Sequence, residues 1–354
     1  MKVYVLPADT SGCGHYRLVW PADTLKRQGM DITIIPPSKE TGFQVRVEEN
    51  PDGSQTLLEV NVPEADLFVL QRPSHVLQPQ LIDHLRRSGV AVVVDMDDDL
   101  STLHPNNVGF RTYQHNRDNL YSWKYALAAC KAATMVTTST HTLQKVYAVH
   151  GRGAVLDNYV PRAALVQDGH VDTGGFGWAG TTLSHPNDLQ VTGDAVRRLI
   201  EDGHLFRVVG GPSKVKEVLR LKEVPDNTGT IDLINWIKTI STSYDVGMVP
   251  LAPTSFNTAK SRLKGIEHMA AGVPWIASPR EEYRRLHRES GCGILVEKPK
   301  DWYAQLKRLL ADDVLRKEQA EAGREYMQSQ TYEANAYKWA EAWTEAVNIQ
   351  RGQS

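Results

Sequence analysis

Short apolar runs rich in β-branched residues alternate along this chain with segments of helical periodicity, and this alternation restricts the possible folds more than any other feature. In the first half of the chain the runs are KVYVLPA, DITIIPP, ADLFVLQR and VAVVVDMD. Runs that are apolar at nearly every position are typical of parallel strands, because helices cover both faces of such a sheet. The sequence therefore predicts an α/β fold.

The alternation occurs twice, on either side of a looser stretch over residues 156–175 that contains proline, glycine and polar residues. We predict a first Rossmann-like domain over residues 1–160, a second over 161–330, and a helical end over 331–354. Two alternating runs flank PDG at about 44–62, which is typical of an antiparallel hairpin inserted into the first domain. Ligands bind beyond the carboxyl ends of parallel strands, so two such domains facing each other would hold a ligand in the cleft between them.

Composition narrows the class of protein. A length of 354 residues fits about two domains, and a formal net charge of −2 argues against nucleic-acid binding by bulk electrostatics. The chain has no apolar run of about 18 residues and does not start like a signal peptide, so we expect neither a membrane span nor export. Cys13, Cys130 and Cys292 lie far apart, which predicts neither a disulfide framework nor a zinc site and favours a reducing, cytoplasmic location.

The segment FNTAKSRLKGIEHMAAGVPWIASP, residues 256–279, is the most informative in the chain. Read as one helix, it places Lys260, Lys264 and Glu267 on one face, at spacings of four and three. Such a face is often only a solvated salt-bridge surface. The opposite side of the helix is already apolar, however, and Gly-Val-Pro then leads into another strand.

This segment resembles the donor-binding helix of GT-B-type glycosyltransferases, especially the retaining family related to glycogen and sucrose synthases. The resemblance implies two facing Rossmann-like domains, with a C-terminal helix that crosses back to the first. It also implies that Glu267 binds the ribose of a nucleotide-sugar, with Lys260, Ser261 and Lys264 beside it. The family's usual second glutamate is replaced here by Ala259, and Asn257 or Lys260 would take over its contact with the sugar.

Two glycine-containing strand ends in the second half are further candidates for donor binding. Gly180 and Thr181 end the strand FGWAG ahead of a helix, where free backbone N–H groups can hold a phosphate. Gly210 ends the strand RVVGG, and the resembling family has a similar loop near the nucleotide. Either loop is also compatible with an ordinary turn, and His185 and Asp188 are residue types that cap a helix.

A glycine-containing loop, TSGCGHYR, follows the first strand of the first half. It matches neither the dinucleotide fingerprint nor the Walker sequence, so an ordinary turn is one interpretation. The resemblance instead implies that Gly14, His15 and Arg17 face the phosphates and the acceptor, and the forked guanidinium of an arginine suits a phosphate. Arg72, at the end of ADLFVLQR, is a weaker candidate for the same cleft.

The run VVVDMDDDL ends in four aspartates within five positions. An acidic strand end that caps the next segment is one interpretation. A haloacid-dehalogenase phosphatase using Asp95 and Asp97 with magnesium is another, although Asp99 stands where that motif has Thr or Val. We favour a third, in which Asp97 and Asp98 reach into the cleft and bind acceptor hydroxyls or take the proton of the acceptor. The acidic strand end resembles one that occurs in some phage and bacterial GT-B proteins.

The expected function is transfer of a sugar from a nucleotide-sugar, such as UDP-glucose, to a hydroxyl acceptor, without a metal or other cofactor. A modified base in phage DNA, a protein and a glycan all remain possible acceptors, and the protein would then act in the cytoplasm, or in that of the host if it is phage-encoded. A DNA acceptor would need a basic rim, for which RPSH with HLRRSG, or PREEYRRLHRES, are candidates, although solvated helix faces explain these arginines equally well. The alternatives are the phosphatase and a non-catalytic GT-B protein that binds sugar nucleotides; the stereochemistry and the oligomeric state stay open.

Overall fold

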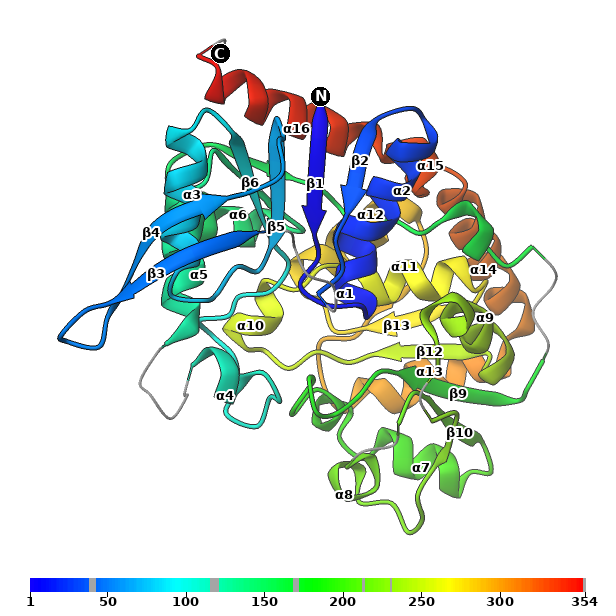
Figure 1. Ribbon diagram of the computed structural model, residues 1–354. Helices are drawn as coiled ribbons and strands as arrows, with labels where there is room; N and C mark the ends of the chain where they lie inside the picture. The colour runs from blue at the N-terminus through cyan, green and yellow to red at the C-terminus, as the bar shows by residue number, and fades with distance from the viewer. Residues whose placement is uncertain (38–42, 115–120, 168–171, 212–213, 230, 353–354) are drawn as a thin grey trace.

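Two six-stranded parallel sheets form the framework of the molecule (Figure 1). The computed structural model describes residues 1–37, 43–114, 121–167, 172–211, 214–229 and 231–352. Each strand pair within the two sheets is parallel, and most of the strands are followed by helices. The predicted fold class, α/β with two Rossmann-like halves, is confirmed.

The first sheet has the strand order β2-β1-β5-β6-β7-β8. Its central strands β5 and β6 are buried at every position, as their continuous apolar sequences predict. The strands are β1 (Lys2–Leu6), β2 (Asp31–Ile34), β5 (Leu67–Gln71), β6 (Ala91–Met96), β7 (Met135–Thr138) and β8 (Gly153–Val155). The helices of this part are α1 (Gly12–Gly14), α2 (Trp20–Arg27), α3 (Gln78–Arg87), α4 (Phe110–Tyr113), α5 (Ser122–Ala132) and α6 (His141–Tyr147).

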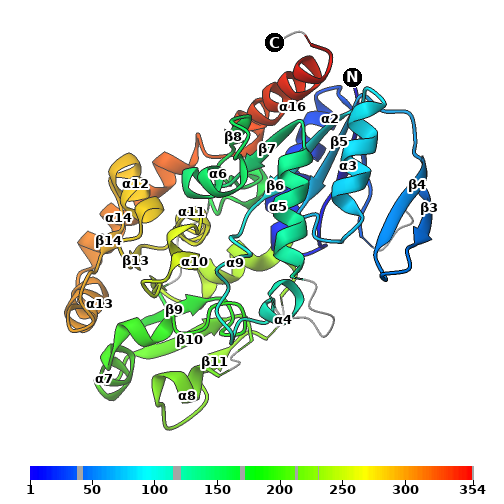
Figure 2. The same cartoon turned by 90° about the vertical axis from the view of Figure 1, so that its left-hand side faces the viewer.

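A separate two-stranded antiparallel sheet projects from the first sheet (Figures 1 and 2). It consists of β3 (Gln44–Glu49) and β4 (Gln55–Asn61), and it corresponds to the hairpin predicted around PDG. Most of its side chains are exposed, and β4 packs on α3, where the Gln80 side chain accepts a hydrogen bond from Leu57 N.

The second sheet has the order β11-β10-β9-β12-β13-β14. Its strands are β9 (Gly175–Ala179), β10 (Leu205–Val209), β11 (Asp226–Asn227), β12 (Val246–Val249), β13 (Trp275–Ala277) and β14 (Ile294–Leu295). The helices that follow its strands are α7 (Ala195–Glu201), α8 (Val215–Leu219), α9 (Leu233–Ser243), α10 (Ser255–Thr258), α11 (Leu263–Ala270), α12 (Glu281–Ser290), α13 (Asp301–Ala311) and α14 (Asp313–Met327).

Two helical segments are interrupted. The helical segment that follows β9 consists of a 3-10 turn, Leu189–Thr192, and then α7, because Gly193 has a φ of +57° that ends the first turn. The helix expected from residue 256 is split into α10 and α11, with residues 259–262 between them. The expectation of one continuous helix there was wrong.

The end of the chain returns to the first sheet. Helices α15 (Tyr332–Asn335) and α16 (Tyr337–Gln350) follow α14, and α16 lies against the first domain in both views (Figures 1 and 2). Trp339 and Trp343 of α16 are fully buried in the hydrophobic cluster that contains Val3, Val5 and Leu67 of the first sheet. None of the helices in the described ranges has the length and apolar character needed to traverse a bilayer.

Candidate active site

A cavity of about 760 Å³ lies between the two domains, where loops after strands of both sheets meet. One wall comes from the loop after β1 and from the end of β6, and the other from the start of α9 and from residues 260–267. This is the place where ligands bind to parallel sheets, because backbone and side-chain polar groups converge at the carboxyl ends of their strands.

Most of the predicted site residues meet in this cavity. Those that line it are His15, Arg17, Asp97, Asp98, Thr181, Lys260, Ser261, Lys264 and Glu267. Gly14, Arg72, Gly180 and Gly210 are not part of the lining. The two donor-site glycines instead pack against each other, since a Cβ on Gly210 would lie 2.7 Å from the carbonyl oxygen of Gly180.

The loop after β1 is organised by Asp9. Its Oδ1 accepts hydrogen bonds from the backbone N–H groups of Ser11 and Gly14, at 2.9 and 3.0 Å, and from the Ser11 hydroxyl. A Cβ at Gly14 would lie 2.0 Å from the Asp9 carbonyl oxygen, so only glycine fits there. The chain then continues as a π-helix over His15–Val19, an arrangement that is frequent at functional sites.

Glu267 is buried on the wall of the cavity, on α11. Its Oε1 accepts a hydrogen bond of 2.9 Å from the Tyr16 hydroxyl of the first domain, and the side chain of Trp236 also hydrogen-bonds to it. Burial raises the pKa of the Glu267 carboxyl, although Lys264 and these two donors oppose the shift. The carboxylate is therefore held in a fixed position by groups from both domains.

Lys260 reaches the cavity from the break between α10 and α11, not from the same helix as Glu267. Its Nζ lies 2.7 Å from Oδ1 of Asp98, so two predicted site residues form an ion pair between the domains. Burial disfavours the charged amine, but Asp98 together with Cys13 and Asp97 outweighs that effect, and the pKa of Lys260 is raised. The helical spacing argument was wrong for Lys260, but its location at the cavity agrees with the prediction.

Lys264 lies one turn before Glu267 and extends over the end of β9. Its Nζ donates a hydrogen bond to the carbonyl oxygen of Ala179 and would lie 3.0 Å from a Cβ on Gly180. Burial lowers the pKa of Lys264, and the nearby Lys260 adds to that effect while Glu267 opposes it. Two ammonium groups therefore face one cavity, an arrangement suited to an anionic ligand.

Ala259, which replaces the family's second glutamate, packs into the hydrophobic cluster of the first domain. Its carbonyl oxygen accepts a hydrogen bond of 3.0 Å from the Thr140 hydroxyl. Asn257 is buried and donates to Asp188 and to the Ala252 carbonyl oxygen, so it does not take the place of that glutamate in the cavity.

The four aspartates at the end of β6 and directly after it have different partners. Asp95 is fully buried and binds the guanidinium of Arg17 with both oxygens, at 3.0 and 2.8 Å. Asp97 lies 3.2 Å from Nε of Arg72, and Asp99 accepts from the backbone and hydroxyl of Ser101. Within the described ranges, no three His, Cys, Asp or Glu side chains are grouped to hold a metal ion. This arrangement does not favour the phosphatase alternative, because Asp95 is already engaged.

Two arginines predicted to meet phosphates are engaged elsewhere. Arg17 is 1% exposed, and Nη1 donates to the Leu156 carbonyl oxygen and to Asn158, in addition to the pair with Asp95. Arg72 pairs with Asp9 and Asp97. These contacts disfavour direct phosphate binding by either guanidinium.

His185 and Asp188 do not cap a helix, as one interpretation of the sequence suggested. The Asp188 side chain makes no capping hydrogen bond to the turn that follows it. Its oxygens contact Nδ1 of His185 at 3.2 Å and the backbone N of Ala252 at 2.9 Å. His185 lines the cavity.

Several arginines in the segments considered as a basic rim already have carboxylate or carbonyl partners. Arg285 pairs with Asp157, Glu282 and Glu289, while Arg86 donates to the Ala132 carbonyl oxygen. These contacts give DNA no advantage over other acceptors.

Comparison with known proteins agrees with this geometry. Residues 175–312, which include the whole second sheet, match the family model described as "Glycosyl transferases group 1". WaaG, a glycosyltransferase involved in lipopolysaccharide biosynthesis, superposes with a TM-score of 0.59 at 14% identity, over 97% of this chain and 100% of that one. The fold is that of a GT-B glycosyltransferase.

Two further solved structures are similar over smaller shares of their length. A mutant of S. aureus TarM, in complex with fondaparinux, alpha-GlcNAc-glycerol and UDP, has a TM-score of 0.52 at 13% identity, over 72% of this chain and 51% of that one. The GtfA/B complex has a TM-score of 0.55 at 11% identity, over 88% and 67%. No curated protein sequence matches the chain.

Several lining residues of this GT-B cavity were not predicted. Tyr16 lies between two predicted site residues in TSGCGHYR, so its position in the sequence could have indicated that it lines the cavity. Asn158 and Trp236 lie outside every recognised motif, and only the tertiary structure brings them to the cavity.

Proposed function

We propose that this chain transfers a glycosyl group from a nucleotide-sugar to a hydroxyl acceptor. The observation that carries the proposal is the set of Lys260, Lys264 and Glu267 around one cavity between two Rossmann-like domains. The group 1 glycosyltransferase match over residues 175–312 and the UDP in the similar TarM structure support the same class of donor.

In this proposal each of the three side chains has a separate task. Glu267 would accept hydrogen bonds from the ribose hydroxyls, exchanging them for the Tyr16 hydroxyl. Lys260 and Lys264 would stabilise the negative charge that develops on the leaving diphosphate, which lowers the barrier because that charge is largest in the transition state. The two lysines supply the positive charge that a metal would otherwise provide.

Asp98 is the carboxylate best placed to meet the acceptor. It comes from the first domain, lines the cavity and contacts Lys260. Donor binding would draw Lys260 towards the diphosphate and free Asp98 to bind or deprotonate the acceptor hydroxyl. Closure of the two domains around the donor would exclude water and limit its hydrolysis.

The test is a thermal-shift screen against UDP-, GDP-, ADP- and dTDP-sugars, with and without EDTA. A ligand at 100 times its Kd adds about 2.7 kcal/mol to the free energy of unfolding, so one nucleotide should raise the Tm by several degrees. We expect the shift to survive EDTA and to be lost in Glu267→Ala, while Glu267→Gln, which keeps the shape of the side chain, should retain part of it.

The failure of every nucleotide to stabilise the wild type would overturn the proposal. Slow hydrolysis of the stabilising nucleotide-sugar without an acceptor would separate an enzyme from a protein that only binds sugar nucleotides. That assay uses the wild-type chain and reads release of the nucleoside diphosphate.

A further inference from the structure

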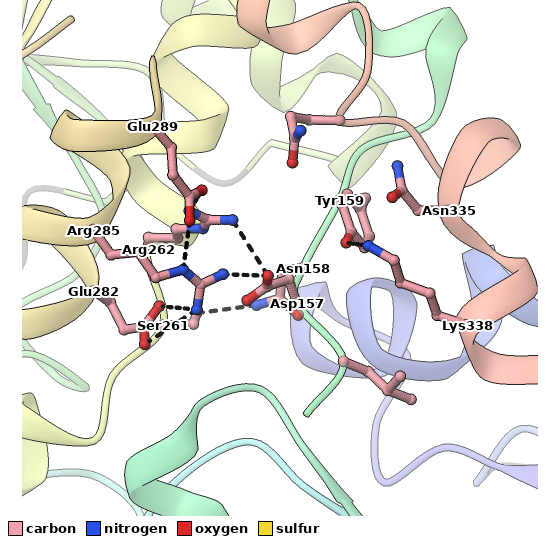
Figure 3. Close-up of polar contacts among 12 residues, drawn as sticks. Asp157, Asn158, Tyr159, Ser261, Arg262, Glu282, Arg285, Glu289, Asn335 and Lys338 are labelled. Carbon is pink, nitrogen blue, oxygen red and sulfur yellow. Dashed lines mark hydrogen bonds and ion pairs between the residues drawn. The ribbon is translucent and has the colours of Figure 1, made fainter. Parts of the chain in front are cut away.

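Three consecutive residues of the segment between the two sheets fasten the domains together (Figure 3). Asp157 pairs with Arg262 and Arg285 of the second domain, and the Tyr159 hydroxyl accepts a hydrogen bond of 2.6 Å from Lys338 of α16. Asn158 lies between them, is only 6% exposed and lines the cavity. Its side chain contacts both domains.

The orientation of the Asn158 amide follows from its partners. Oδ1 lies 2.9 Å from Nη1 of Arg17, and Nδ2 lies 3.0 Å from Oγ of Ser261. A guanidinium can only donate hydrogen bonds, so the amide atom that faces Arg17 must be the oxygen. The amide nitrogen therefore faces Ser261.

This orientation determines the direction of the Ser261 hydroxyl. Because Nδ2 of Asn158 donates to the oxygen of Ser261, the hydroxyl hydrogen has to point elsewhere. Across the described residues, the contact with Asn158 is the one hydrogen bond that the Ser261 side chain makes. Ser261 is partly exposed to the cavity, next to Lys260, so the hydroxyl can donate into the cavity.

The chain of hydrogen bonds starts at a buried ion pair. Asp95 holds Arg17, Arg17 donates to Asn158, and Asn158 donates to Ser261. All donors point the same way, from the guanidinium to the cavity. Hydrogen bonds in such a chain polarise one another, and in a poorly solvated interior this strengthens the last donor. A donor beside two ammonium groups suits a phosphate oxygen.

We propose that Asn158 is a positioning residue that directs the Ser261 hydroxyl, as a hydrogen-bond donor, at the diphosphate of the donor substrate. This rests on the proposed function, and it gives Arg17 a role in phosphate recognition that acts through Asn158 rather than by direct contact. Asn158 thereby couples the first domain to the phosphate-binding part of the second.

The experiment reverses the direction of the hydrogen bond between residue 158 and Ser261. In Asn158→Asp both carboxylate oxygens accept hydrogen bonds, so the hydroxyl of Ser261 turns towards residue 158 and away from the ligand. We expect the affinity for the best-binding nucleoside diphosphate, chosen from UDP, GDP, ADP and dTDP and measured by isothermal titration calorimetry, to fall about tenfold or more, the usual loss for one hydrogen bond to a charged group. Ser261→Ala should show a similar loss, while Ser261→Thr, which keeps the hydroxyl, should bind as the wild type does.

A double variant separates this role from simple repulsion by the new carboxylate. If Asn158 acts through Ser261, adding Asn158→Asp to Ser261→Ala causes no further loss of affinity. A further tenfold loss of affinity in the Ser261→Ala background would overturn the proposal. Wild-type affinity in Ser261→Ala alone would also overturn it, and this second test remains if Asn158→Asp does not fold. Wild-type protein that binds neither the nucleoside diphosphates nor inorganic diphosphate would overturn the proposed function together with this inference. Normal wild-type binding with unaffected variants overturns the inference alone.

Discussion

Single side chains at the domain junction show how this molecule holds charges in partly buried positions. Glu289 accepts hydrogen bonds from Arg262 and from the Tyr326 hydroxyl, and it also pairs with Arg285. Partial burial alone would raise the pKa of Glu289, but Arg262 and Tyr326 lower it to about 2. The ionised carboxylate is therefore favoured in the folded state.

Glu289 should contribute to the stability of the protein in mild acid. A carboxyl whose pKa is lower in the folded than in the unfolded chain stabilises the fold above its unfolded pKa of about 4.5, and this contribution is lost as the pH falls towards 2. After allowance for the exposure of Glu289, the contribution is about 1 kcal/mol. Urea unfolding at pH 6 and pH 3 should show a smaller loss of stability in Glu289→Gln than in the wild type, with Tyr326→Phe in between. Equal losses in all three proteins would contradict this account.

At the scale of elements, close packing between strands and the segments beside them explains residue choices that the chemistry of the site does not. Gly177 lies in the middle of β9, where a strand would normally carry a β-branched residue. The ring of Tyr244, which is fully buried, occupies the space that a side chain would need: a Cβ on Gly177 would lie 1.9 Å from Cδ1 of Tyr244. The glycine lets the aromatic ring pack directly on the strand.

Gly177→Ala adds only one methyl group, but it is expected to be strongly destabilising. Tyr244 would have to leave its position or β9 would have to shift, and overpacking of this kind costs about 1–3 kcal/mol. Gly211→Ala is the matched control, since a Cβ there meets no atom within 4 Å. Denaturant unfolding should show a lower midpoint for the first variant and little change for the second. Similar midpoints would show that the Tyr244 ring moves aside without a loss of stability.

In the whole molecule, α16 packs the C-terminal end of the chain against the N-terminal domain. Trp339 is fully buried against the first sheet, and its indole Nε1 donates a hydrogen bond of 3.0 Å to the carbonyl oxygen of Arg17. Tyr332, just before it, donates to the carbonyl oxygen of Tyr16. The last helices thus support the π-helix that carries the first-domain wall of the cavity.

Trp339→Ala should lower the free energy of unfolding by about 3–5 kcal/mol, because it leaves a cavity in a core shared by distant parts of the chain. Tyr337→Ala removes an aromatic residue of the same helix that is 52% exposed, and it should change stability by no more than about 0.5 kcal/mol. Urea unfolding of both variants provides the comparison. Equal effects would show that α16 is not an integral part of the first domain.

Local pattern was sufficient for the architecture and for the main charged residues of the site, but not for Tyr16, Asn158 and Trp236. The continuous apolar strands predicted two parallel sheets, since only burial on both faces explains them. Strand ends then indicated where polar side chains would converge, and Lys260, Lys264, Glu267 and Asp98 do line one cavity.

The amino-acid sequence by itself thus determined the two-sheet α/β fold and the charged groups that face the cavity, because hydrophobic periodicity and strand ends are local properties. Only the tertiary structure decided which charges pair. Arg17, predicted to bind phosphate, binds Asp95 instead, 78 positions along the chain, and Asn158 connects it to Ser261, 103 positions further on. Such partners are chosen by burial and geometry: a charge removed from water needs a compensating group, and the fold determines which one is within reach.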